Sequence, residues 1–343
     1  MPDHAAHNTA PIDTSPPTAA GATSDRSRPP IATIVISTRN RRDELARTLE
    51  SCCAQTGGAE GWVEVLVVDD ASTDGTREMI AQRFPSVRVI HKTVRPGYIV
   101  SRNLGAREAR GPIIFSIDDD AVYTSDDTVL RTLGAFDDPR VGAVAMPHIH
   151  VTDGPAEYDR APDDGRMYVA AAYTGTAHAL RRDVFLALGG YQEALEHQAE
   201  ESEFCMRLWN AGYIVRIGVT PPIHHFPSAV RNYPRQLFLG ARNAVLTSWF
   251  NVPTLYLPGR LLANFAGGCI NALRKRHPDS FLSGVIAGLC SIPRLRSLRR
   301  PVGARPYRLF RRLLANTCRP IEEVLPLLPP RAPIAAEAQG AGA

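Results

Sequence analysis

Four short apolar runs alternate with helix-like segments in the first third of the chain, and this alternation restricts the fold more than any other feature. The runs cover residues 31–36, 63–68, 87–90 and 113–117. Each is rich in β-branched residues and mostly apolar, which is typical of a strand buried on both faces. The intervening segments have the length of helices. We therefore predict an α/β domain with a mixed, mainly parallel sheet.

The intervening segments can be placed more closely. Residues 42–54 put Leu45 and Leu49 on one side of a predicted helix. Asp74 is placed to cap a second helix that runs to residue 84, because a short acidic side chain accepts hydrogen bonds from the first free backbone N–H groups. A third helix is predicted over residues 101–110.

The two ends of the chain differ in composition from this domain. Residues 1–29 are rich in Pro, Ala, Ser, Thr and Asp and show no periodicity, so we expect a disordered tail. The α/β domain is expected over residues 30–250. A helical extension is expected over 251–330, followed by a second disordered tail over 331–343.

The charge of the chain is unevenly distributed. From Arg231 to the end there are 17 basic and 4 acidic residues, whereas residues 1–230 carry 22 basic and 31 acidic residues, which together give the net charge of +4. Arginine clusters interleaved with apolar helical segments suit an anionic lipid surface. We expect peripheral membrane attachment and no nucleic-acid partner; the alternative is an ordinary helical cap with a solvated face.

Three further observations concern location. The best apolar run, residues 281–292, is too short to span a membrane and is interrupted by serine and glycine. The N-terminus has neither the basic start nor the apolar core of a secretory signal. The six cysteines show no C-x-x-C spacing, as expected of idle thiols in a reducing compartment. We expect a cytoplasmic protein on the inner face of the plasma membrane.

Polar clusters follow three of the predicted strands. They are Ser37-Thr38-Arg39-Asn40, Asp69-Asp70 and Asp118-Asp119-Asp120. Because the carboxyl ends of parallel strands meet at one edge of a sheet, we expect these clusters to share one crevice.

The aspartate run is a candidate metal site. Three adjacent carboxylates repel one another unless a cation compensates them, and oxygen ligands suit Mg²⁺ or Mn²⁺. The alternative is a solvated acidic turn, and the acidic pair on the neighbouring strand favours the metal. His224 or His225, after a strand-like segment, could add a ligand or could simply pack or cap.

Three glutamates begin a predicted helix over residues 199–209. A helix dipole favours acids there without any function, and Glu203 can pair with Arg207 one turn later. Glu200 and Glu201 have no such partner in the sequence, so either is a candidate general base. The chain contains no G-x-G-x-x-G, no G-x-x-x-x-G-K-[ST] and no G-x-S-x-G, which removes support for dehydrogenases, P-loop enzymes and serine hydrolases.

Seven short motifs in a fixed order make this chain resemble the family 2 glycosyltransferases. The motifs are residues 34–41, 67–76, 101–105, 115–121, 189–193, 200–207 and 241–243. The resemblance covers roughly residues 31–250. It implies a single Rossmann-like domain with the A-type nucleotide-sugar transferase fold, followed by the basic helical extension.

The resemblance also implies roles. Ser37, Arg39 and Asp70 correspond to residues that hold the nucleoside, and Arg102 to a basic residue that approaches the nucleotide. The D-x-D motif corresponds to Asp118-Asp119-Asp120, with Asp118 and Asp120 as metal ligands and Asp118 and Asp119 near the donor. Glu201 corresponds to the catalytic base, and His224 or His225 to a further metal or phosphate contact.

Two departures from the family pattern affect these roles. Arg39 stands where an aromatic residue is common, and Glu200-Glu201 replaces the more usual Glu-Asp. The implied reaction is metal-dependent transfer of a sugar from a nucleotide sugar to a carbohydrate or lipid-linked acceptor, with inversion, in cell-envelope synthesis. The alternatives are a sugar-phosphate nucleotidyltransferase, which would open with a glycine-rich loop, and a non-catalytic nucleotide-sugar-binding protein.

Overall fold

The computed structural model describes residues 29–334, apart from 59–61, 96, 228–231 and 316–317. The expected disordered tail over residues 1–29 lies outside the described residues except for its last position, and so do residues 335–343 of the second tail. All six cysteines are free thiols.

A nine-stranded mixed sheet forms the centre of the described chain. Its strands, in spatial order, are β13 (Arg319–Pro320), β9 (Tyr168–Ala170), β11 (Ile214–Ile217), β6 (Val141–Ala145), β10 (Ala177–Arg181), β4 (Ile113–Ile117), β1 (Ala32–Thr38), β2 (Val63–Asp69) and β3 (Arg88–His91). The first four strands in the sequence are parallel, whereas β10 runs antiparallel to both of its neighbours. The prediction of a mixed, mainly parallel sheet is confirmed.

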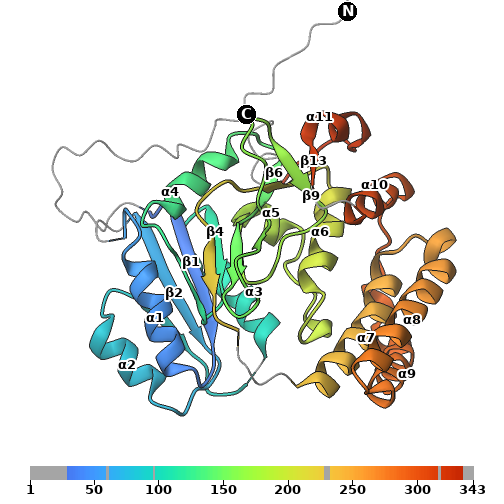
Figure 1. Cartoon of the computed structure of the whole chain (residues 1–343), viewed down its shortest axis with the longest axis horizontal. Helices are drawn as coiled ribbons and strands as arrows, with labels where there is room; N and C mark the ends of the chain where they lie inside the picture. The colour runs from blue at the N-terminus through green and yellow to red at the C-terminus, as the bar shows by residue number, and fades with distance from the viewer. Residues whose placement is uncertain (1–28, 59–61, 96, 228–231, 316–317, 335–343) are drawn as a thin grey trace, which may run out of the picture.

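Helices cover the sheet, as Figure 1 shows. They are α1 (Arg42–Cys53), α2 (Thr76–Arg83), α3 (Tyr98–Glu108), α4 (Thr128–Leu133), α5 (Arg182–Ala187) and α6 (Glu200–Asn210). α1 buries Leu45 and Leu49 as the sequence pattern predicted. α3 crosses β1 closely at Gly105, where a Cβ atom would lie 2.3 Å from the Val35 side chain.

Two helix starts differ from the sequence-based prediction. α2 begins one residue after Gly75, whose φ of 84° is left-handed, while the Asp74 carboxylate accepts hydrogen bonds from the Thr76 N–H and hydroxyl groups. Asp74 therefore still accepts hydrogen bonds from the first residue of α2, although it lies one residue before the N-cap residue, Gly75. α3 begins at Tyr98, three residues before the predicted start.

A second, four-stranded sheet lies beside the first. Its order is β5 (Ala121–Val122), β12 (Ile223–His225), β7 (His148–His150) and β8 (Glu157–Tyr158). These strands have two or three residues each, which is too short for an apolar pattern to reveal them. β12 pairs antiparallel with β5 and sets His225 opposite Ala121, so a histidine from late in the chain lies next to the aspartate run.

The C-terminal part is helical, as predicted. It contains α7 (Tyr233–Asn251), α8 (Leu257–Arg274), α9 (Pro278–Leu295), α10 (Ala304–Leu314) and α11 (Ile321–Val324). α7, α8 and α9 gather on the side of the molecule away from α1 and α2 (Figure 1). α9 lies directly against α7 because Gly284 and Gly288 present no side chain there: a Cβ atom on Gly284 would lie 2.2 Å from the Phe238 carbonyl oxygen.

One helix in the described part of the chain has the length and composition of a membrane span. It covers Pro278–Leu298, with a mean hydropathy of 1.2, and 17% of it is buried. The sequence run was expected to be too short and too interrupted. The expectation differs from the structure because Ser283, Gly284 and Gly288 do not end the helix. The helix runs through them, and its mean hydropathy stays at that of a weakly apolar span.

Candidate active site

The three polar clusters meet in one cleft of about 730 Å³ at the carboxyl ends of β1, β2 and β4. Ser37 lies at the end of β1 and Arg39 follows it, Asp70 follows β2, and the aspartate run follows β4. The cleft is also lined by charged and aromatic groups that the sequence did not single out as site residues, among them Arg41, Tyr98, His197 and Arg235. The residues at the ends of β1, β2 and β4 converge because these strands are parallel. The other lining residues reach the cleft through the tertiary fold.

One part of the cleft carries buried polar atoms without a partner. Asp70 is buried, and its Oδ1 atom accepts no hydrogen bond within the described residues; the Ser37 hydroxyl is likewise unsatisfied. A buried polar atom without a partner costs about 1–3 kcal/mol. Both atoms therefore have hydrogen-bonding capacity for a polar ligand in this part of the cleft, where Arg39 also lies.

The three aspartates point in different directions. Asp119 turns inward, where its Oδ2 accepts a 2.8 Å hydrogen bond from the Thr38 hydroxyl. Burial raises the pKa of Asp119 to about 7, although Arg41 and Thr38 oppose this shift. Asp118 faces the cleft and accepts a 2.8 Å hydrogen bond from the Tyr98 hydroxyl. The middle aspartate is therefore part of the framework, and Asp118 is the most exposed of the three.

Asp120 lies between the side chains of Arg41 and His225. Its Oδ2 atom is 2.7 Å from the Arg41 guanidinium, and its Oδ1 atom is 3.1 Å from His225 Nε2. Burial alone would raise the pKa of Asp120, but hydrogen bonds from His225 and Arg41 hold it below its usual range. His225 and Arg41 together therefore favour the ionised form of this carboxylate.

Asp118, Asp120 and His225 form a possible metal-binding group, with one donor atom from each within 4.8 Å of the others. Two carboxylates and one imidazole suit a divalent ion of the Mn²⁺ or Mg²⁺ kind. The Nδ1 atom of His225 lies 2.8 Å from His150 Nδ1, which leaves Nε2 directed at Asp120. Of the two candidate histidines, the structure brings His225 to this group; His224 lies outside it, because neighbouring side chains on a strand point to opposite faces.

The guanidinium of Arg102 lies behind the cleft, among buried polar groups. It donates to Glu201 Oε1 at 2.9 Å, to the Ser116 hydroxyl at 3.1 Å and to the Gly175 carbonyl at 3.2 Å. The rings of Tyr98 and Tyr191 lie 5.0 and 4.9 Å from it. Arg102 is not among the residues that line the cleft. Its charge is directed at Glu201, not at the position expected for a nucleotide.

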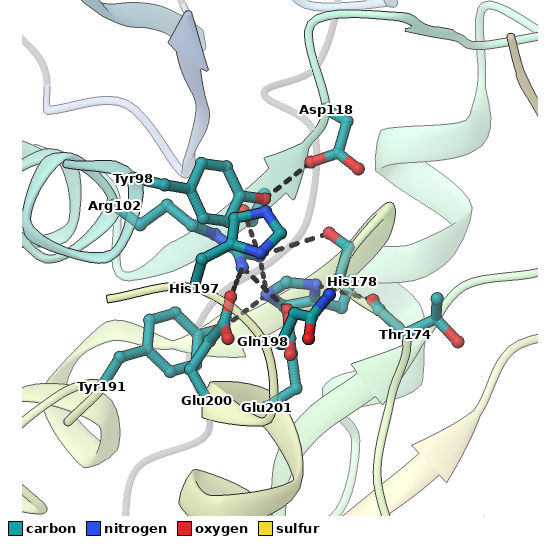
Figure 2. Close-up of polar contacts among 12 residues, drawn as sticks. Tyr98, Arg102, Asp118, Thr174, His178, Tyr191, His197, Gln198, Glu200 and Glu201 are labelled. Carbon is teal, nitrogen blue, oxygen red and sulfur yellow. Dashed lines mark hydrogen bonds and ion pairs between the residues drawn. The ribbon is translucent and has the colours of Figure 1, made fainter. Parts of the chain in front are cut away.

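A chain of contacts joins the metal-binding group to the candidate base. Figure 2 shows Asp118, Tyr98, Arg102 and Glu201 following one another, with His197 beside the Tyr98 ring. Gly175 borders this chain closely, since a Cβ atom there would lie 2.4 Å from Glu201 Oε1. Only glycine at position 175 therefore leaves room for the Glu201 carboxylate where it lies.

Glu200 and Glu201 occupy different environments although they are adjacent. The Glu200 side chain is 2% exposed and its Oε2 atom has no hydrogen-bond partner, whereas the Glu201 side chain is 17% exposed and bonded to Arg102. Burial, and then the neighbouring Glu201 charge, raise the pKa of Glu200 to about 8. Glu200 is therefore protonated at neutral pH.

The segment before these glutamates has an unusual backbone. Glu196, Gln198 and Ala199 have φ values of 64°, 75° and 70°, in the left-handed region that non-glycine residues rarely adopt. The buried Asn243 amide group lies within 2.9 Å of the carbonyl oxygens of residues 195, 197 and 198. This side chain from α7 therefore maintains the strained approach to α6.

The predicted pair of Glu203 and Arg207 is confirmed, with contacts of 2.6 and 2.8 Å. Arg207 also donates to the Gly190 carbonyl at 2.7 Å, and Asn251 donates to Glu203 at 2.9 Å. The pair therefore connects α6 to the loop before it and to the end of α7, away from the cleft.

Residues 33–189 match the family model described as "Glycosyl transferase family 2". An uncharacterized glycosyltransferase of Haemophilus influenzae is 28% identical over 187 residues, which cover 51% of this chain and 60% of that protein. The succinoglycan biosynthesis protein ExoO of Rhizobium meliloti is 41% identical over 101 residues, which cover 29% of this chain and 26% of that protein. The matched part thus spans less than two thirds of either relative.

A solved structure shares the fold. The mannosyltransferase PcManGT from Pyrobaculum calidifontis, in complex with GDP-Man and Mn²⁺, superimposes with a TM-score of 0.51 at 21% identity. The match covers 78% of this chain and 88% of that one.

The metal-binding group gives a first testable prediction. We expect His225→Ala to weaken Mn²⁺ binding by roughly tenfold, about 1.4 kcal/mol, because it removes one of three donors. His224→Ala is the matched control on the same strand and should leave Mn²⁺ binding unchanged. Mn²⁺ titration followed by electron paramagnetic resonance measures both, and equal affinities for the two variants would exclude His225 as a ligand.

The environment of Glu200 gives a second prediction. Its pKa is higher in the folded chain, about 8, than the ordinary value of 4.5, so the folded state holds this proton more tightly than the unfolded state does. The stability that this group contributes is therefore lost as pH rises from about 4.5 to about 8. We expect Glu200→Gln to raise Tm at pH 9 far more than at pH 5.

The control for this prediction is Glu78→Gln, which changes an exposed carboxylate on α2. Its effect on Tm should be small at both pH values. A Glu200→Gln effect that is the same at pH 5 and pH 9 would contradict the prediction.

Proposed function

Because this chain belongs to family 2 of the glycosyltransferases, we propose that it transfers a sugar from a nucleotide-diphosphate donor to an acceptor hydroxyl. The observation that carries the proposal is the continuous path from Asp118 through Tyr98 and Arg102 to Glu201. It connects a group suited to a divalent metal with a carboxylate that has an exposed edge. A metal-dependent, inverting sugar transfer uses both.

The donor would bind along the sheet edge. The unsatisfied Asp70 Oδ1 and Ser37 hydroxyl are suited to the nucleoside, and Arg39 lines the same part of the cleft. Asp118, Asp120 and His225 would hold Mn²⁺ or Mg²⁺, and a protein that shares the fold was solved in complex with GDP-Man and Mn²⁺. When bound, this ion would offset charge on the donor diphosphate and on the departing nucleoside diphosphate.

Glu201 is the residue we assign as general base. Arg102 holds it in place, and its exposed edge gives it access to an acceptor, whereas Glu200 is buried and protonated at neutral pH. Glu201 would take the proton of the acceptor hydroxyl as that oxygen attacks the anomeric carbon. The bond from this carbon to the diphosphate oxygen breaks in the same displacement, which inverts the anomeric configuration.

This assignment predicts the result of two matched variants. A general base contributes about 10²- to 10⁴-fold, so Glu201→Gln should lower kcat by that factor and leave donor binding, measured by thermal shift, unchanged. Glu200→Gln should retain most of the activity. The assay is release of nucleoside diphosphate from a panel of nucleotide sugars with Mn²⁺ and saccharide acceptors.

Each outcome of this assay has a clear meaning. Loss of activity in Glu200→Gln with retention in Glu201→Gln would transfer the role of base to Glu200. Tight donor binding without release of nucleoside diphosphate from any donor would favour a non-catalytic binding protein. Formation of a new nucleotide sugar and pyrophosphate would indicate a nucleotidyltransferase, although β1 here leads into Ser37 and Arg39 instead of a glycine-rich loop.

The helical C-terminal part would attach the enzyme to the inner face of the plasma membrane. α8 exposes Leu262, Phe265, Ile270 and Leu273, and α9 exposes Leu282, Ile286 and Leu289. Asp279 is the only acidic residue between Glu203 and Glu322, while arginines are frequent there. Exposed apolar side chains in a cationic region suit an anionic lipid surface. A lipid-linked or envelope saccharide as acceptor agrees with the succinoglycan biosynthesis of the relative ExoO.

Membrane attachment predicts salt-sensitive pelleting with vesicles. The full chain should pellet at low salt with phosphatidylcholine vesicles that contain phosphatidylglycerol, and less at high salt. Leu262→Asp, at a side chain that is 70% exposed, should weaken pelleting severalfold because it places a carboxylate in the lipid-facing side. Val219→Asp, at an exposed valine outside α8 and α9, is the control. No pelleting of the unaltered chain at low salt would exclude the attachment.

A further inference from the structure

A groove of about 460 Å³ lies between α7, α8 and α9, next to the cleft. The described residues that line it are Gln198, Gln236, Leu237, Gly240, Ala241, Ala244, Asn264, Gly267, Gly268, Asn271, Lys275 and Phe281. The proposed function assigns no role to this groove.

The groove and the cleft share a wall. His197 and Arg235 line the cleft, while the next residues in sequence, Gln198 and Gln236, line the groove. The wall is therefore made of the strained segment before α6 and the first turn of α7. Glu201 follows Gln198 by three residues, and Figure 2 shows the Gln198 side chain beside Glu200 and Glu201. A ligand in the groove would contact the segment that positions the base.

The chemistry of the lining suits a saccharide. Four carboxamides, from Gln198, Gln236, Asn264 and Asn271, offer donors and acceptors of the kind that bind hydroxyl groups. Glycine at position 267 leaves the α8 side of the groove free of bulk, while Gly268 makes room for the Phe281 ring, which supplies an apolar surface.

The charge of the lining indicates an anionic ligand. Lys275 is the basic residue of the lining, and none of the lining residues is acidic. The Lys275 Nζ atom lies 4.3 Å from the centre of the Tyr233 ring, which directs it across the α7 end of the groove.

The two sides of α8 differ. Asn264, Gly267, Asn271 and Lys275 recur every three or four residues and face the groove. The exposed Leu262, Ile270 and Leu273 fall on the opposite side of the helix. The helix thus separates a polar groove from the side that we assign to the membrane.

We propose that this groove binds the part of the acceptor beyond the reacting sugar, as saccharide units that carry a phosphate or carboxylate near Lys275. This inference rests on the proposed function and names the substrate class: an anionic glycan acceptor. The shared wall would then couple its binding to the placement of its reacting hydroxyl at Glu201.

The test fills the groove without disturbing the fold. Gly267→Leu adds a side chain where no atom lies within 4 Å of the new Cβ position, and leucine favours the helix more than glycine does. Gly259→Leu is the matched control, because Gly259 lies on the same helix, has equally open surroundings and lies outside the groove. The probe is an array of microbial saccharides, with and without phosphate or uronic acid groups, read with the full chain.

We expect the unaltered chain and Gly259→Leu to retain the same anionic saccharides, and Gly267→Leu to bind them at least tenfold more weakly. Lys275→Gln should weaken binding of the anionic saccharides and spare neutral analogues, and its relative effect on phosphate and uronate members identifies the anionic group. Equal retention by the Gly267→Leu and Gly259→Leu variants, or no retention of any saccharide by the unaltered chain, would overturn the proposal.

Binding on the array is independent of turnover, so the two proposals can fail separately. Saccharide retention that is lost in Gly267→Leu, without sugar transfer from any donor, would support the groove and reject the proposed function. Sugar transfer with the same acceptor KM in Gly267→Leu and in Gly259→Leu would support the function and reject the groove.

Discussion

The buried guanidinium of Arg102 is the charge around which the rest of the site is arranged. It joins α3 to the start of α6 through Glu201, to β4 through Ser116 and to the loop before β10 through the Gly175 carbonyl. Two adjacent carboxyl groups lie at the start of α6, and this cation faces both of them. Removing one partner of a buried ion pair typically costs about 3–5 kcal/mol because the other charge is left uncompensated, so the contact that orients the base cannot be lost without a cost in stability.

A second cation organises the aspartate run. Arg41 lies within 3.4 Å of Asp119 and within 2.7 Å of Asp120, so three consecutive acids do not face the cleft as uncompensated charges. The three carboxylates therefore have different contacts. Asp119 accepts a hydrogen bond from Thr38 inside the domain, while Asp118 and Asp120 have donor atoms near His225. The cleft therefore offers a divalent ion two carboxylates and one imidazole instead of three carboxylates.

The sequence was sufficient to predict the parallel strands, the cleft at their carboxyl ends and the aspartate run within it, since all three follow from local apolar patterns and strand direction. It could not distinguish His224 from His225, because that choice depends on the pairing of a three-residue strand. The role of Tyr98 was also hidden, since the helix start at this residue depends on its tertiary surroundings. Arg102 was expected at the nucleotide because sequence position does not show which way a buried side chain turns.

The proposed donor and acceptor sites lie in separate parts of this chain. The cleft is built at the ends of strands of the central sheet, whereas the groove lies among three helices, and Asn243 and Arg242 of α7 anchor the segment between them. Exchange of side chains along one face of α8 would alter the accepted glycan without altering the sheet edge. With this division, substitutions in one helix can change which product is made, while the residues that carry out the transfer stay the same.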